Sequence, residues 1–136
     1  MKNLTLLLFI SVCLILFACN KETKSDRFLL LTGPTWTSDS LLWDGVDASN
    51  PGQKLAKFKG DAKFREDGTG YFGQYIGTWR FSFNETELVI DSDSLQVALT
   101  ANIAELTKTS LKITTAYPNP ANPSNPIDIR MTFKAK

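Results

Sequence analysis

Residues that commonly carry out catalysis are scarce in this chain of 136 residues. It contains no histidine, so the commonest general base and the commonest metal ligand are missing. Its serines therefore have no imidazole to activate them. Carboxylates gather in three short stretches rich in turn residues, Asp44–Asp47, Glu66-Asp67 and Asp91–Asp93, and none has the ligand spacing of a calcium loop. We therefore expect no enzymatic activity, no metal site and no cofactor.

The two cysteines of the chain both lie near its N-terminus. Cys13 falls in Leu4–Phe17, an apolar run of 14 residues preceded by Lys2. This run is shorter than the roughly 20 residues of a membrane-spanning helix and is typical of a secretory signal. The four residues Leu16-Phe17-Ala18-Cys19 resemble the lipobox of bacterial lipoproteins. In those proteins the signal is removed before the cysteine, which then receives a diacylglycerol and usually an N-acyl chain.

This resemblance implies that residues 1–18 are a signal peptide and that the mature chain is anchored to a membrane through a lipidated Cys19. Two or three acyl chains anchor a protein stably, because each buried CH₂ contributes about 0.8 kcal/mol. Residue 20 is asparagine and not the aspartate that retains related lipoproteins at the inner membrane, so we expect the outer membrane. Whether the protein lies on the periplasmic or the surface face of that membrane is left undecided. The alternative is an ordinary secretory signal cleaved after Ala18.

The residues after the signal divide into a tether and one domain. Residues 19–27 are polar and lack apolar periodicity, which predicts a flexible tether. Residues 28–136 have the length of a single domain, and we expect a monomer. The chain has 15 basic and 14 acidic residues, so no basic surface for nucleic acid is expected.

Period-two alternation dominates the domain and predicts an all-β fold. The short apolar run Phe28–Leu31 is either one or two turns of helix or a lead-in strand. The proline-rich run 117–126 is a stiff connection at one rim. In the strand Leu95–Leu106 the apolar residues change parity partway along, and a bulge near Ala101-Asn102 would keep them on one face. The expected strands are Thr35–Trp43, Lys54–Phe64, Tyr71–Gly73, Ile76–Phe83, Glu87–Asp91, Leu95–Leu106, Leu111–Thr115 and Ile127–Lys134.

About eight strands joined by consecutive hairpins favour an up-and-down antiparallel barrel, because closure removes exposed edges. Two strands, Ile76–Phe83 and Ile127–Lys134, alternate most clearly between apolar and polar residues. We expect their larger apolar side chains to face the barrel interior, and these are Trp79, Phe81, Phe83, Met131 and Phe133.

Several short motifs, in order, are similar to the lipocalin-like lipoproteins of Gram-negative bacteria. They are Leu30…Gly33…Trp36, Phe64…Asp67-Gly68-Thr69, Gly77-Thr78-Trp79 and Ile103–Thr107…Leu111. The resemblance covers roughly residues 27–136 and implies an eight-stranded calycin-type barrel, in a family with no established enzymatic activity for most members. Lipocalins pack an arginine of the last strand over the first-strand tryptophan. Here Gly33 and Trp36 are one residue further apart, and Arg130 falls on the polar face, so we do not expect that contact.

An eight-stranded barrel can be filled with side chains or can hold one small ligand, and the sequence leaves both possibilities open. The first hypothesis is a lipid-anchored, non-enzymatic protein of the cell envelope that binds a small apolar ligand among the five inward residues. The alternative is a filled barrel that binds a protein partner through its rim loops, as an accessory, inhibitor or assembly factor.

Overall fold

The structure, a computed structural model, describes residues 22–136 and contains one helix, one short 3₁₀ helix and nine strands. The predicted signal peptide, Cys19 and the first residues of the predicted tether lie outside the described residues. The helix α2 spans Asp26–Thr32 and the 3₁₀ helix η1 spans Ala56–Phe58. The strands are β1 Trp36–Trp43, β2 Val46–Asp47, β3 Asp61–Phe64, β4 Thr69–Phe72, β5 Tyr75–Ser82, β6 Glu87–Asp91, β7 Leu99–Leu106, β8 Ser110–Tyr117 and β9 Ile127–Ala135.

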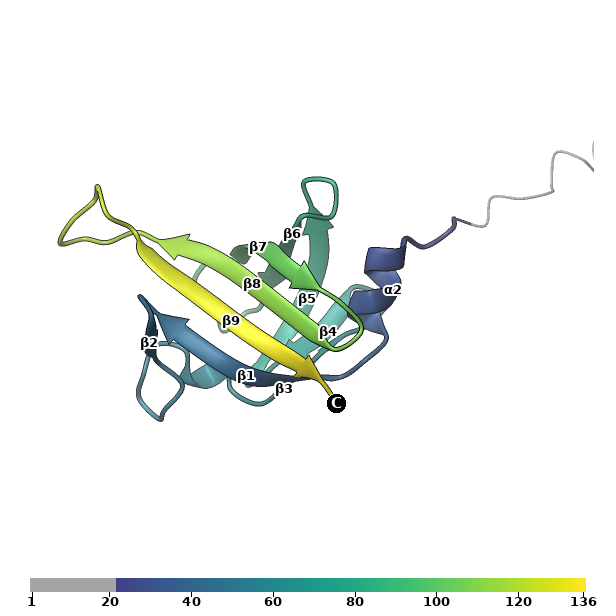
Figure 1. The fold of residues 1–136 in the computed structure, drawn as a ribbon, viewed down its shortest axis with the longest axis horizontal. Coiled ribbons are helices and arrows are strands. Elements are labelled where there is room, and N and C mark those ends of the chain that lie inside the picture. Colours follow the sequence, from purple (N-terminus) through teal and green to yellow (C-terminus); the bar gives the residue numbers. More distant parts are fainter. Residues whose placement is uncertain (1–21) are drawn as a thin grey trace, which may run out of the picture.

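The strands form one closed antiparallel barrel (Figure 1). Each strand from β3 to β8 pairs with the next in the chain, β1 pairs with β3, and β9 returns to pair with β1. The two-residue β2 pairs with β1 alone, so eight of the nine strands make the wall. The predicted all-β, eight-stranded, up-and-down barrel is therefore confirmed.

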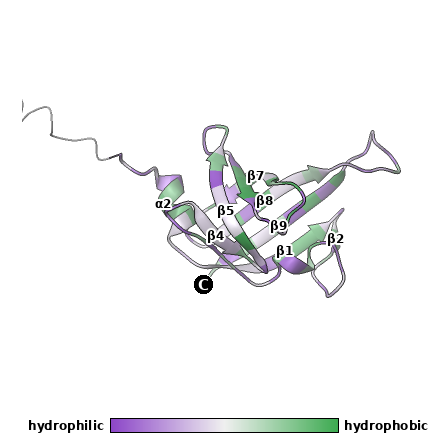
Figure 2. Ribbon diagram, turned by 180° about the vertical axis from the view of Figure 1, so that it is seen from behind, coloured by the Kyte–Doolittle hydropathy of each residue, from purple (hydrophilic) through white to green (hydrophobic). Residues whose placement is uncertain are grey.

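The strand registers bring inward-facing residues of neighbouring strands opposite one another. Met131 of β9 lies opposite Leu41 on β1 and Ile113 on β8, and all three are buried. Figure 2 shows hydrophobic and hydrophilic stretches following one another along the strands, as expected when one face is wet and the other is dry. The buried side chains form one continuous hydrophobic cluster inside the wall.

The barrel has two different ends. At the helix end, the turns 65–68, 83–86 and 107–109 surround α2, while the loop end carries the segments 44–60, 92–98 and 118–126. In Figure 1 the described chain begins beside α2, and the long β8–β9 connection extends from the opposite side. The wall strands run between these two ends.

The helix α2 closes the helix end. The Ser25 hydroxyl caps the helix by accepting a hydrogen bond from the Phe28 amide at 3.0 Å, as is typical of an N-cap serine. Leu31 is fully buried in the core. Phe28–Leu31 is thus helical, and the alternative of a lead-in strand is wrong. Because the cap is at Ser25, the predicted boundary of the tether after residue 27 is too late.

Lys63 and Trp36 hold the end of α2 against the barrel. The Lys63 ammonium donates hydrogen bonds to the carbonyls of Thr32, Gly33 and Pro34 at 2.8–3.0 Å, which satisfies acceptors that a helix C-terminus leaves free. The indole Nε1 of Trp36 donates to the Leu31 carbonyl at 3.0 Å.

Arg130 confirms the expectation that the last-strand arginine does not cover Trp36. Its guanidinium pairs with Asp128 at 2.7 Å on the outside of β9, and its side chain is largely exposed. An exposed pair of this kind contributes little to stability. The arginine is outside because its position on β9 has the opposite parity to the buried Ile129 and Met131.

The prediction of one strand over Lys54–Phe64 is wrong in its first half. Ala56–Phe58 is a 3₁₀ helix, and β3 begins only at Asp61 after Gly60, whose φ is +115°. The apolar residues Leu55 and Phe58 are buried. Two buried residues three apart suit a 3₁₀ turn, in which such side chains lie above one another.

The strand predicted from Leu95 also begins later than expected. β7 starts at Leu99, and Val97 is exposed at the loop end. The irregularity predicted near Ala101-Asn102 lies further along, between Ile103 and Glu105. After this shift in register Leu106 lies opposite Leu111, so the apolar side chains at this end of β7 again face the barrel interior.

We expect stability to fall in acid because three carboxyl groups have lowered pKa values. The Lys136 ammonium and then the Thr37 hydroxyl lower the pKa of Asp61 by hydrogen bonding to its carboxylate. Hydrogen bonds from Thr69 lower the pKa of Asp67, and those from Ser110 and Lys112 lower that of Glu105. These groups stabilise the folded state fully above about pH 4, and their contribution disappears as the pH falls through the lowered values.

Thermal unfolding followed by circular dichroism between neutral pH and pH 2 would check this expectation. Between neutral pH and pH 2, the melting temperature of the variant Asp61→Asn should fall less than that of the wild type. Asp93→Asn, in an exposed turn, is the matched control and should follow the wild-type curve. Identical acid profiles for wild type and Asp61→Asn would contradict the role of the Asp61 pair.

Candidate functional site

Four of the five residues predicted to face the interior do so. Trp79 is 6% exposed, Met131 and Phe133 are buried, and Phe81 is half-buried against the core. The ring of Phe81 packs edge-on against the Trp79 indole with 5.5 Å between centroids. The indole Nε1 also donates to the Arg65 carbonyl at 2.9 Å, so its polar atom is satisfied.

Phe83 is the exception, and its predicted inward position is wrong. It is 78% exposed because β5 ends at Ser82 and the chain turns at Phe83 with φ of +48°. The next two residues, Asn84 and Glu85, have φ of +54° and +62°. Three left-handed residues in succession remove the aromatic ring from the alternation that would have placed it beside Phe81.

The four predicted ligand-binding side chains that do face inward are packed into the core of the domain. The ring of Phe64 lies 5.0 Å from that of Phe72 and 5.6 Å from that of Trp79. Phe28 of α2 adds a further contact to Trp79, with 5.7 Å between centroids. Aromatic pairs at these distances stabilise a core beyond the burial of their area.

The loop end is filled from the side by the segment between β1 and β3. Phe58 of η1 packs on Tyr75, with 4.6 Å between ring centroids, and burial raises the pKa of the Tyr75 phenol. Leu55 and Ala48 are buried beside them. This segment occupies the space that opens because β1 and β3 share only two pairs, at Trp36 and Thr37.

A surface hollow of about 310 Å³ lies at the loop end, and we refer to it as the Trp43 hollow. Its lining is apolar on one side and polar on the other, and it consists of Trp43, Val46, Asp47, Ala48, Gly52, Gln53 and Lys54. Such a lining, an aromatic face with a few polar groups around it, is typical of small-molecule sites.

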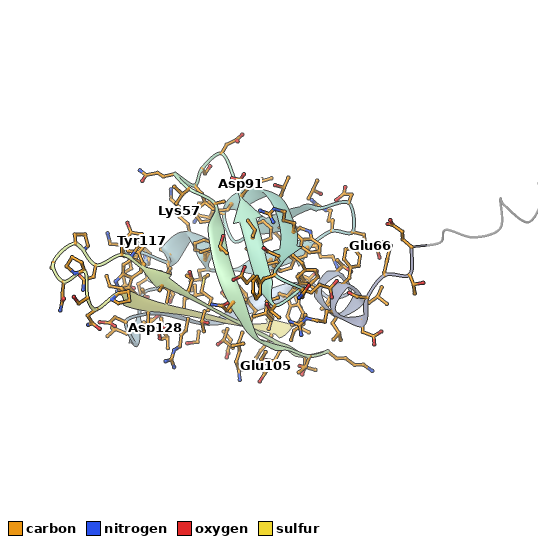
Figure 3. All side chains as sticks on the ribbon, turned by 90° about the horizontal axis from the view of Figure 1, so that it is seen from above. Lys57, Glu66, Asp91, Glu105, Tyr117 and Asp128 are labelled. Carbon is orange, nitrogen blue, oxygen red and sulfur yellow. The ribbon has the colours of Figure 1, made fainter. Side chains whose placement is uncertain are left out.

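Local structure holds the aromatic face of the Trp43 hollow in place. The ring of Tyr117, on β8, packs against the Trp43 indole with 5.2 Å between centroids. The Lys54 ammonium lies 6.0 Å from the centroid of the same indole, within the range of a cation–π contact. Figure 3 shows Tyr117 at the end of the molecule opposite Glu66, which pairs with Lys24 beside α2.

The backbone of segment 44–60 forms the other wall of the Trp43 hollow. The tight turn between β1 and β2 uses left-handed Asp44 and Gly45, and the amide of Ala48 then returns to the Leu41 carbonyl at 2.9 Å. The amide of Leu55 donates to the carbonyl of Ala48 at 3.0 Å. This site was not predicted from the sequence, although Trp43 directly before an Asp-Gly turn indicates an aromatic residue at a rim.

Two further hollows lie outside the barrel. A groove of about 500 Å³ between α2 and the turn before β8 is lined by Asp26, Leu29, Leu30, Pro34 and Lys108. Another, of about 400 Å³, lies over β8 and β9 and has a more polar lining that includes Lys112, Thr114 and Arg130. Neither has an aromatic wall like that of the Trp43 hollow.

The described part of the chain offers no cluster for metal binding. Within residues 22–136, no three His, Cys, Asp or Glu side chains are grouped so that they could hold an ion. The Asp91–Ser94 turn is stabilised internally, since Ser92 is buried and its hydroxyl donates to the Ile76 carbonyl at 2.8 Å. The one helix among these residues is too short to cross a membrane.

The wall strands form an eight-stranded up-and-down antiparallel barrel, and the Trp43 hollow lies at its loop end. No protein-family model and no curated protein sequence matches the chain. Among solved structures, it is similar to the bovine odorant binding protein in complex with a selenium-containing odorant. The identity is 15%, the match covers 87% of this chain and 78% of that chain, and the TM-score is 0.46.

Trp79 should be essential to the core. We expect Trp79→Ala to lower the free energy of unfolding by about 3–5 kcal/mol, because it removes a buried ring and leaves a cavity. The exposed Phe83 is the matched control, and Phe83→Ala should change stability by about 0.5 kcal/mol or less. Denaturant unfolding measures both. A loss below about 1 kcal/mol for Trp79→Ala would contradict the burial of the indole.

Proposed function

We propose that this chain is a lipid-anchored, non-enzymatic binding protein of the cell envelope that takes a small ligand at the mouth of its barrel. The Trp43 hollow is the observation that carries the proposal. We place the proposed ligand site there and not at the interior site predicted from the sequence, because the inward aromatic side chains already pack on one another.

The orientation of the domain supports this assignment. Cys19 precedes the helix cap Ser25 by six residues, so a lipid on Cys19 would hold the helix end near the membrane. The Trp43 hollow lies at the opposite end, where a ligand can approach from the aqueous side. The envelope location, with the outer membrane as the expected site, rests on the lipobox and on Asn20.

The lining of the Trp43 hollow indicates the chemistry of the ligand. The Trp43 indole offers a flat apolar surface, and Asp47, Gln53 and Lys54 offer an anion, an amide and a cation around it. The volume of about 310 Å³ is near the lower bound for drug-sized ligands. We infer a small, flat, partly apolar molecule with hydrogen-bonding groups at its edge.

A protein partner at the loop end is the second candidate function. Three large apolar side chains, Val46, Val97 and Tyr117, are at least half exposed at that end. Exposed apolar side chains that cluster at one end of a small domain mark an interaction surface. Neither candidate requires catalysis, in keeping with a chain that contains no histidine and, after lipidation, no free thiol.

Native mass spectrometry of the protein extracted from its own membrane would test binding. We expect wild-type protein to carry the added mass of a small molecule, and Trp43→Ala to lose it through at least a tenfold drop in affinity, about 1.4 kcal/mol. Val97→Ala, at the same end but outside the hollow, is the control and should keep the ligand. Retention by Trp43→Ala would contradict the site.

Fluorescence offers a second measurement of the same prediction. Trp36 and Trp79 are buried, while Trp43 is half-buried in the hollow, so ligand should change the emission of Trp43 alone. The variant Trp43→Phe should lose this response. If Val97→Asp abolishes binding of a protein partner while binding of the small ligand is unchanged, the protein-partner candidate is favoured instead.

The anchor gives a separate prediction. Cys19→Ser should move the protein from the membrane fraction to the soluble fraction after cell fractionation, because it removes the acyl chains. The mature wild-type chain should show the mass of a diacylglycerol on its first residue. If Cys19→Ser still sediments with membranes, the lipobox interpretation is wrong.

A further inference from the structure

We propose that the helix end of the barrel lies directly on the bilayer, with Phe83 and Leu29 inserted among the lipids. This inference rests on the proposed lipidation of Cys19 and goes beyond it. An acyl anchor by itself requires only a tether, whereas contact between the barrel and the bilayer would fix how the domain stands on the membrane.

The length of the tether limits where the domain can lie. Ser25 caps α2 six positions after Cys19. Six residues span at most about 20–22 Å when fully extended. The helix end, where the chain enters the domain, must therefore stay close to the lipid surface.

The Phe83–Glu85 turn has an unusual backbone that presents an aromatic ring to the outside. Phe83 is 78% exposed at φ of +48°, and such a conformation is a genuine outlier for a bulky residue. Strained residues of this kind persist where the surrounding structure holds them and often mark functional sites. An aromatic ring in water is a poor arrangement, but aromatic rings are enriched at the membrane interface.

Contacts with the start of α2 hold this turn beside the tether. The Ser25 hydroxyl donates to the Glu85 carboxylate at 2.7 Å, and the Arg27 Nε donates to the Glu85 carbonyl at 2.9 Å. Phe83 is therefore fixed close to the point where the lipidated segment leaves the domain. A membrane-bound segment and an exposed phenylalanine meet at the same end of the barrel.

Leu29 is a second exposed apolar side chain at the helix end. It is 49% exposed on α2 and lines the groove of about 500 Å³ together with Leu30 and Pro34. Charges at this end are of both signs, since Lys24 pairs with Glu66 and Asp26 lines the groove with Lys108. The contact should therefore depend on apolar insertion and only weakly on salt or anionic lipid.

A fluorescent probe on the turn tests the proposal in the full lipidated protein. Its mature chain has no free thiol, because Cys13 is removed with the signal and the Cys19 thiol is acylated, so one added cysteine can be labelled. An environment-sensitive dye is placed on Asn84→Cys, next to Phe83, or on Val97→Cys, which is 77% exposed at the loop end. The labelled proteins are inserted into phosphatidylcholine vesicles that contain spin-labelled lipids.

We expect the dye at residue 84 to shift to the blue and to be quenched at least twofold by the spin-labelled lipids, at low and at high salt. The dye at residue 97 should keep the emission wavelength that it has in water and should not be quenched by the spin-labelled lipids. Adding Phe83→Ser to the Asn84→Cys protein should remove at least half of the quenching. Melting temperatures close to that of the unlabelled protein confirm that each variant is folded.

The other outcomes separate this inference from the proposed function. If the mature chain carries acyl groups but the dye at residue 84 is not quenched, the domain stands away from the bilayer and only this inference fails. If no acyl mass is found, both fail. A blue shift at residue 84 without quenching by lipid would mean that the turn binds a protein or a second copy, which also overturns the inference. Quenching that is unchanged by Phe83→Ser would exclude the role of Phe83.

Discussion

The pairing of β1 with β9 is the constraint on which the rest of the molecule depends. It joins Trp36 to Ala135 at the helix end and Trp43 to Ile129 at the loop end. Because this contact closes the sheet, every wall strand is paired on both sides and the domain has few exposed edges. Closure also leaves the inward side chains with no neighbours except one another, and an eight-stranded barrel is narrow enough for them to fill it.

The same closure explains why the functional features lie at the ends. β1 pairs with β9 over most of its length and with β3 only at Trp36 and Thr37, so the wall would be open between β1 and β3. Segment 44–60 folds into that opening, buries Leu55 and Phe58, and leaves the Trp43 hollow on its outer side. Because the middle of the barrel is packed, the irregular rim is where we place the proposed binding site.

The two ends offer different surfaces, which suits a protein held at one end. The helix end carries α2, the short approach from Cys19 and the strained Phe83 turn, while the loop end carries the Trp43 hollow and exposed apolar side chains. If the helix end rests on lipid, the wall strands act as a rigid spacer that presents the hollow to the aqueous side. Membrane attachment and recognition would then be separated by the length of the barrel.

Alternation along the chain was enough to determine the barrel and the burial of Trp79, Met131 and Phe133, because side-chain direction in a strand is set locally with a period of two residues. The tertiary structure decided where that period stops. Phe83 continues the alternating pattern but lies outside, because the turn is held in a left-handed conformation by contacts with α2, a segment distant in the sequence. The Trp43 hollow likewise depends on how segment 44–60 folds back against β1, which no local pattern records, since loop packing is set by the space that the closed wall leaves.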